Sequence, residues 1–320
     1  MQARELRRLR GRGFTMIELL VSMAVLGIVS VAIVGFIVPA INAQRDVERR
    51  AALVDATEAV LRRLSRDIRV ALPSSLRITN TGSGFAIELV PTIDGARYCT
   101  AAVANCATGN VLTIAAADGI FDVLGCFRHS FVTGVATNAF RLVIGNAAGA
   151  VYTATTSASV MTPVQNITPS LFPNTPAGTA VCGNASSTAN SYNRHRLTLT
   201  ANQTFPTAST RQRLFVVQNV DAPVSYICDT TAGTLTRYAG YRTAAGSFSN
   251  AGQPTTAATL LAMTTPPTST GIVASNVSAC SVTSTEVQVQ NNSVVTLSVA
   301  LSSSGDTVSL MNQVQLDNSP

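Results

Sequence analysis

The chain has 320 residues, of which only 12% are charged and 46% are hydrophobic, and it contains two histidines and no tryptophan. Its formal net charge of +6 does not indicate nucleic-acid binding, because five arginines and one glutamate in the first thirteen residues contribute +4 of it. Neither this cluster nor the arginines of segment 62–69 alternate with aromatic side chains, as nucleic-acid surfaces do. The composition excludes a basic nucleic-acid module and favours a loop-rich β domain beyond residue 73.

A basic leader, residues 1–13, precedes an uncharged apolar run at 19–41. As a helix this run is about 35 Å long, enough to cross the hydrocarbon core of a bilayer. Basic residues precede it and the first acidic residue after it is Asp46, which places the N-terminus in the cytoplasm. We therefore expect residues 14–43 to form a transmembrane helix half.

The helical pattern continues into residues 44–72, which we expect to be an amphipathic half. Apolar or small side chains recur there at helical spacing: Leu53, Thr57, Val60, Leu61, Leu64 and Ile68. Pro73 ends the pattern, so one helix is predicted from about Phe14 to about Val70. The charges on its other face predict two pairs at i,i+4 spacing, Glu58 with Arg62 and Arg63 with Asp67.

Two simpler interpretations of the apolar segment are a secretory signal peptide and a plain signal anchor. A secretory peptide has an apolar core of about 7 to 15 residues followed by a small-x-small cleavage site, whereas this run is longer and continues into the amphipathic pattern. An anchored periplasmic protein that never polymerises would keep its first thirteen residues.

The stretch Arg-Gly-Phe-Thr-Met-Ile-Glu at 12–18 resembles the class III signal of type IV prepilins and pseudopilins. The resemblance implies cleavage by a prepilin peptidase between Gly13 and Phe14, followed by N-methylation of Phe14. It also implies that Glu18 pairs with the α-amine of Phe14, in the same subunit or a neighbouring one, during assembly. A carboxylate at mid-bilayer costs about 2.5 to 3.5 kcal/mol, so Glu18 needs a partner in an apolar environment.

We expect residues 73–320 to form a β-rich head domain. Short alternating runs predict strands at 75–79, 85–90, 111–114, 140–145, 196–200, 213–220, 224–228, 234–241, 293–301 and 306–316. Stretches 153–190 and 243–270, rich in Thr, Ser, Ala and Pro, are predicted to be long surface loops. The expected fold is α+β and pilin-like, with the amphipathic helix half packed on antiparallel sheet.

Segments 224–241, 276–282 and 294–320 resemble minor pilins of the mannose-sensitive haemagglutinin (MSHA) pilus, of the MshO, PilW and GspJ type. This resemblance implies a minor pilin of a type IV pilus that supports pilus assembly and adhesion. Its partners would be other minor and major pilins and the inner-membrane assembly platform. It would lie in the bacterial inner membrane as a single-pass prepilin and then in the pilus. The alternatives are a pseudopilin of a type II secretion system and a tip adhesin that binds a surface glycan.

All cysteines lie beyond residue 73, which indicates an oxidising compartment and up to three disulfides. The six residues are Cys99, Cys106, Cys126, Cys182, Cys228 and Cys280. Fifteen pairings are open; we expect Cys99 with Cys106 across a short loop, Cys228 with Cys280 and, by elimination, Cys126 with Cys182.

The sequence predicts no enzyme, cofactor or metal site. Neither His129 nor His195 lies in a nucleophile elbow, a metal-binding helix or a Gly-rich phosphate loop. No Cys-x-x-Cys spacing occurs, and the histidines are not near a cysteine pair, so a zinc site is not expected.

Overall fold

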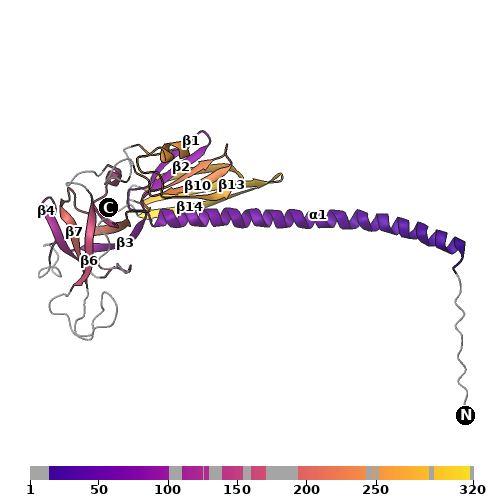
Figure 1. The fold of residues 1–320 in the computed structure, drawn as a ribbon, viewed down its shortest axis with the longest axis horizontal. Helices are drawn as coiled ribbons and strands as arrows, with labels where there is room; N and C mark the ends of the chain where they lie inside the picture. The colour runs from indigo at the N-terminus through magenta and orange to yellow at the C-terminus, as the bar shows by residue number, and fades with distance from the viewer. Residues whose placement is uncertain are drawn as a thin grey trace, which may run out of the picture. The chain divides into compact units, whose positions relative to one another are not determined.

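The computed structural model describes residues 14–100, 110–124, 126–129, 139–153, 160–170, 194–242, 248, 252–287 and 292–317. The chain divides into two compact units, Met1–Ala52 and Leu53–Pro320. The first is helical where it is described, and the second combines the end of the same helix with antiparallel β-structure. The fold is α+β and consistent with a pilin-like protein, as the sequence predicts (Figure 1).

Helix α1 (Met16–Arg69) has nearly the predicted bounds and is continuous through Pro39. Its buried residues are Leu53, Thr57, Val60, Leu61, Leu64, Ser65 and Ile68, so the predicted apolar stripe is confirmed, with Ser65 added. The Thr57 hydroxyl donates to the Leu53 carbonyl at 2.6 Å, which satisfies a polar group on the buried face. The stripe thus follows the 3.6-residue period of an amphipathic helix.

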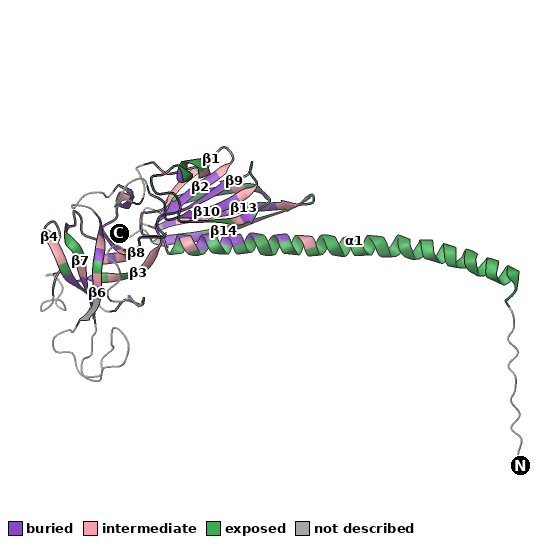
Figure 2. Cartoon of the chain, in the orientation of Figure 1, coloured by how far each residue is buried: buried purple, intermediate pink, exposed green. Residues whose placement is uncertain are grey.

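Two antiparallel sheets cover this stripe. The first contains, in spatial order, β1 (Arg77–Thr81), β2 (Gly84–Leu89), β9 (Val224–Asp229), β10 (Thr234–Ala239) and β11 (Ser269–Ser275). The second contains β12 (Val277–Val287), β13 (Asn292–Ser303) and β14 (Asp306–Asp317). Leu64 and Ile68 share one buried cluster with Phe85 of the first sheet and with Val299 and Leu316 of the second. Figure 2 shows the buried stripe at this end of α1.

Polar contacts add to the packing of the helix on the first sheet. The Tyr226 hydroxyl donates to Asp67 Oδ2 at 2.6 Å, and Arg237 Nε donates to the same oxygen at 3.2 Å. Burial raises the pKa of Tyr226, and its hydrogen bond to Asp67 raises that pKa further. The expected pairing of Arg63 with Asp67 is therefore wrong, because the carboxylate bonds to the sheet instead. The other expected pair is confirmed, with Arg62 Nη2 2.5 Å from Glu58 Oε1.

The remaining strands form a closed barrel. In order around it they are β3 (Thr92–Tyr98), β4 (Ala117–Leu124), β7 (Arg194–Thr204), β6 (Met161–Ser170), β5 (Phe140–Ile144) and β8 (Arg213–Gln218). Its buried cluster includes Tyr98, Phe121, Leu142, Leu197 and Leu214. All six strands lie in sequence between β2 and β9, which are themselves paired, with Leu89 opposite Val224. The barrel is thus an insertion between two neighbouring strands of the first sheet.

Several expectations for the head are wrong in detail. Segment 111–114 is not a strand; its Leu112 packs into the barrel cluster and donates its amide to the Cys99 carbonyl at 2.9 Å. Predicted loop 153–190 contains barrel strand β6, and predicted loop 243–270 contains helix α2 (Ala257–Leu261) and the start of β11. Strands β3, β4, β6, β11 and β12 and the short helix η2 (Ala150–Tyr152) were not predicted.

Candidate functional site

Thr15 forms the cap that starts helix α1. Its hydroxyl accepts from the backbone N–H of Glu18 at 3.3 Å, and its carbonyl accepts the first helical bond, from Leu19, at 3.1 Å. This is the geometry of an N-cap residue with an acidic residue at the third helical position. The Thr-x-x-Glu spacing at 15–18 is a capping-box signal, so this start of the helix could be predicted from the sequence.

The Glu18 side chain lies in this first turn and is exposed. No described residue donates a hydrogen bond to its carboxylate or pairs with it. The neighbouring Phe14 side chain is 72% exposed. The helix start therefore presents an accessible carboxylate and an accessible aromatic ring one turn apart. The predicted cleavage residue Gly13 lies outside the described residues.

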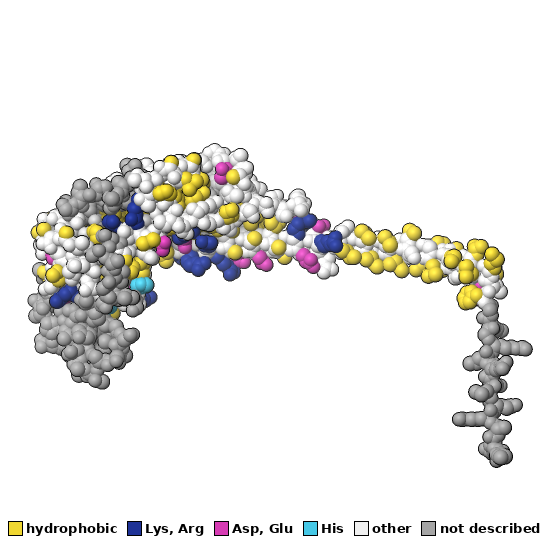
Figure 3. Space-filling view, in the orientation of Figure 1, with side chains coloured by type: hydrophobic (Ala, Val, Ile, Leu, Met, Phe, Trp, Pro, Cys, Tyr) yellow, Lys and Arg dark blue, Asp and Glu magenta, His cyan; other side chains and the backbone are white. Residues whose placement is uncertain are grey.

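Between this turn and the head, the helix is apolar and bare. No residue from 14 to 52 is buried, and large apolar side chains from Met16 to Val47 are exposed on all sides (Figures 2 and 3). Among the described residues, one helix, Met16–Arg69, is long and apolar enough to cross a membrane. Such a surface is stable only in lipid or against other apolar helices.

Two glycines lie within the bare segment. A Cβ added at Gly27 or Gly35 would meet nothing within 4 Å, so packing within the subunit does not require either glycine. Glycine inside a helix costs about 0.5 to 1 kcal/mol relative to alanine. Small residues on a membrane helix allow another helix to approach closely, and such an approach gives these positions a use.

A band of charged side chains follows the apolar run. Arg49 Nη2 lies 2.5 Å from Asp46 Oδ1, and Gln44 Nε2 donates to Glu48 Oε1 at 3.0 Å. Figure 3 shows acidic and basic side chains gathered along this part of α1. The band begins near residue 43, where the sequence predicts the end of the transmembrane half.

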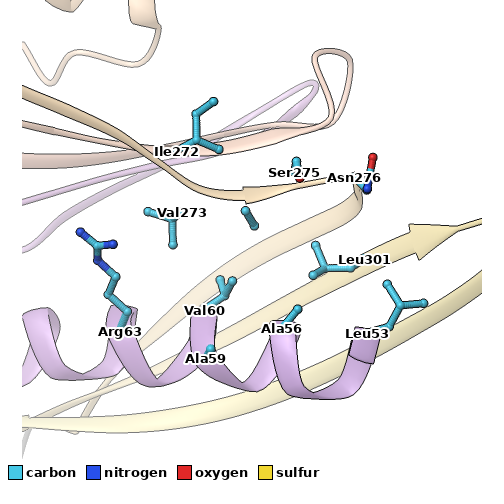
Figure 4. Close-up of a pocket in the computed structure, with 11 residues that line it drawn as sticks. Leu53, Ala56, Ala59, Val60, Arg63, Ile272, Val273, Ser275, Asn276 and Leu301 are labelled. Carbon is cyan, nitrogen blue, oxygen red and sulfur yellow. The ribbon is translucent and has the colours of Figure 1, made fainter. Parts of the chain in front are cut away.

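An open groove of about 500 Å³ lies between α1 and strand β11 (Figure 4). Leu53, Ala56, Val60 and Ile272 contribute apolar surface to it, while Arg63 is its one charged lining residue. The groove therefore contains no acid–base pair and no nucleophile next to a base. The groove has no local signal in the sequence, because β11 begins in a segment predicted to be a loop and the rest of that strand was not predicted.

The two histidines occupy different positions in the barrel region. His195 is buried, and its Nδ1 accepts from the Phe127 backbone N–H at 3.1 Å. Burial lowers the pKa of His195, and the charge of Asp94 partly opposes that shift. His129 is exposed and stacks edge-on with Phe140. Among the described residues, no group of three His, Cys, Asp or Glu side chains could hold a metal ion.

A disulfide joins the two sheets that cover the helix. Cys228 of β9 is bonded to Cys280 of β12, the pairing expected from the sequence. Cys99 and Cys126 are also disulfide-bonded. Cys106 and Cys182 lie outside the described residues, so the pairings of the other four cysteines stay predictions.

Comparison with known proteins identifies the N-terminal segment. Residues 8–34 match the family model for the prokaryotic N-terminal methylation motif. This segment contains Gly13, Phe14, Thr15 and Glu18, and the match supports a type IV pilin-like or pseudopilin-like protein that is processed by a prepilin peptidase. No curated protein and no solved structure matches the chain.

Proposed function

We propose that this chain is a minor pilin that joins the initiation or tip complex of a type IV pilus of the MSHA type and supports assembly and adhesion. A prepilin peptidase cleaves between Gly13 and Phe14 and methylates the new N-terminus. The subunit lies in the inner membrane with its head in the periplasm, and the assembly platform then moves it into the pilus with other minor and major pilins.

The observation that carries this proposal is the first turn of α1. Glu18 is an exposed carboxylate at the start of a bare apolar run, and no described residue pairs with it. Cleavage before Phe14 creates a cationic α-amine one helical turn away. In a bundle of apolar helices, a pair between Glu18 and the Phe14 amine of a neighbour neutralises both charges, which are costly to leave in hydrocarbon.

The rest of the bare helix supports the same conclusion. Its apolar side chains require lipid before assembly and other helices after it. Gly27 and Gly35 leave room for a neighbouring backbone to approach. The head, by contrast, covers only the stripe from Leu53 to Ile68 and leaves the charged outer face of the helix in water.

Substitution of Glu18 by Ala tests the proposal. We expect normal cleavage and membrane insertion but at least about tenfold less subunit in sheared pili, because the acidic partner of the amine is lost. Met23→Ala, on the same bare segment, is the matched control and should be incorporated nearly as well as the wild type. Wild-type amounts of E18A in pili would contradict the proposed role of Glu18.

A pseudopilin of a type II secretion system has the same N-terminal requirements, and the methylation motif fits both. A clean deletion of the gene separates the two functions. Loss of surface pili with normal secretion supports the minor pilin, and loss of protein secretion with normal pili supports the pseudopilin.

A further inference from the structure

Strand β11 is the outer strand of the five-stranded sheet. It pairs with β10 on one side, and no described strand pairs with its other side. Alternate backbone N–H and C=O groups of such an edge strand point away from the sheet and can pair with another chain. The free edge of β11, residues Ser269–Ser275, can therefore extend the sheet by one strand.

This strand has little of the protection that sheet edges usually have. Natural edges commonly carry Lys or Pro, or a bulge that twists them away. Segment Ser269–Ser275 contains no charged residue and no proline, and Ile272 at its middle is 68% exposed. A register shift leaves Val273 without a partner on β10, and both Val273 and Ala274 contact the core cluster. This one bulge is the only protective feature within the strand.

The groove between α1 and β11 lies beside this edge (Figure 4). On the helix side, Ala56 and Ala59 are exposed and end at their Cβ atoms, which leaves the groove open beside them. Val60 and Leu301, both part of the core cluster, also line it. With a volume of about 500 Å³, the groove has room for several side chains. A strand added to β11 could place alternate side chains in it.

Arg63 gives the groove its charge. It is exposed, and it is the one charged side chain among the described residues that line the groove. Figure 4 shows it at the Ile272 end of the groove, away from Leu53. Asp67, one turn further along α1, accepts from Tyr226 instead. A carboxylate on a ligand in the groove would meet its complementary charge at Arg63.

We propose that β11 and the exposed flank of α1, formed by Ala56, Ala59 and Arg63, are a docking site for an extended acidic segment of a partner protein. The segment adds to the sheet as a strand next to β11, with apolar side chains toward the two alanines and one carboxylate toward Arg63. Main-chain hydrogen bonds supply affinity, and the groove and Arg63 supply specificity. All of these residues belong to the unit Leu53–Pro320, so the site is independent of processing at Gly13.

A second copy of this chain fits the site less well. The β11 strand of a second copy has no charged residue that could pair with Arg63. Symmetric pairing of two β11 edges would also place the Arg63 side chains of both copies at one interface, where like charges repel. The partner is therefore expected to be a different protein with an acidic strand.

The test uses the processed full-length chain in lipid nanodiscs and fluorescent peptides of alternating Thr and Val, about as long as β11. One set of peptides carries a single Glu at each position in turn, and a matched set carries Lys instead. We expect the best Glu peptide to bind at least about threefold more tightly than its Lys counterpart at low salt, because Arg63 attracts one and repels the other. Hydrogen exchange of the amides of residues 269–275 should slow on binding, because the added strand pairs with their free N–H groups.

Three variants separate the parts of the site. Arg63→Gln should remove the preference for Glu over Lys. Ala56→Phe, which fills the groove from an exposed position, should weaken binding of both sets at least about tenfold. Arg66→Gln, an equal loss of charge on the same helix but outside the groove, should leave both properties unchanged. All three positions are exposed, so the midpoint of thermal unfolding should stay at the wild-type value.

Several results would overturn the proposal. One is that no peptide binds to the wild type beyond its binding to empty nanodiscs. Another is that Arg63→Gln keeps the full preference for Glu, or that bound peptide leaves amide exchange at residues 269–275 unchanged. If the same amides become protected without peptide as the chain is concentrated, the site belongs to a second copy, which would also contradict the proposal.

Discussion

The two halves of helix α1 have similar apolar side chains in different surroundings. From Leu53 to Ile68 the apolar residues form a stripe on one face, and two sheets bury it, so that Leu64 is 0% exposed. From Met16 to Val47 they occupy every face, and Leu26 is 64% exposed. A one-sided stripe can be covered by the same chain, whereas an all-round apolar surface needs lipid or other helices. The proposed function uses the first half for assembly, and the second half contributes to the stability of the head.

Charged residues differ between the halves in the same way. The covered half has charges on its outer face, including the pair of Arg62 and Glu58. Its Asp67 accepts a hydrogen bond from Tyr226 of the first sheet. Residues 16–43 have one carboxylate, Glu18, and no described residue pairs with it. We infer that Asp67 is satisfied on folding and that Glu18, on the proposed function, is satisfied on assembly.

The largest effect on folding is expected for Leu64→Ala. Removing a fully buried leucine from the core between helix and sheets should lower the free energy of unfolding by about 2 to 5 kcal/mol. Leu26→Ala, the matched change in the bare half, should alter it by less than about 0.5 kcal/mol. Chemical denaturation of the processed chain in micelles, followed by tyrosine fluorescence, measures both. An equal decrease in the free energy of unfolding for the two variants would contradict the distinction between the halves.

The second prediction concerns the disulfide between the two sheets that bury the stripe. Cys228 and Cys280 are 52 residues apart and join the two sheets that bury the stripe. Replacing both by Ala should lower the free energy of unfolding by about 2 to 4 kcal/mol, mainly because the unfolded chain gains freedom. Thermal unfolding compares this variant with Ser284→Ala, an exposed control on β12. If the double variant were as stable as that control, the disulfide between the two sheets would not contribute to stability.

We expect the smallest effect from a decrease in pH. It should lower the stability of the barrel, which contains His195, rather than that of the helix. The pKa of His195 is lowered in the folded state, so the unfolded chain takes up the proton first as the pH falls below the ordinary value of 6.5. The stability that neutral His195 contributes is present above that pH and is lost below it. Protonated Nδ1 could no longer accept from the Phe127 N–H.

His195→Gln removes this titration and keeps a side-chain acceptor. Its unfolding midpoint should fall less than that of the wild type between about pH 7.5 and pH 5. Calorimetric scans at the two pH values provide the measurement. The same pH dependence in both proteins would contradict the assignment.

The helix could be predicted from the sequence because its signals are local. An uninterrupted apolar run, a 3.6-residue stripe and a terminal proline determine its length and its buried face. Strands that are short runs of apolar, β-branched and aromatic residues, such as β2, β10 and β13, were predicted for the same reason. The predicted pairing of Arg63 with Asp67 is wrong because spacing along a helix does not show which distant residues lie near a side chain. Tyr226, far away in sequence, donates a hydrogen bond to the Asp67 carboxylate.

The barrel could not be predicted, because it depends on pairings between distant segments. Strand β3 contains Asp94 and Gly95, which are typical of turns, yet pairing with β8 makes it extended. Strand β6 contains two prolines and lies in a Thr- and Ser-rich stretch.

Mass spectrometry of the intact protein from its native host, with fragmentation of its N-terminus, tests the central claim most directly. The proposed function predicts a chain that begins at Phe14 with one methyl group on its α-amine, so that a cationic terminus stands beside Glu18. A native chain that still begins at Met1, or one cut after the apolar segment at 19–41, would contradict it.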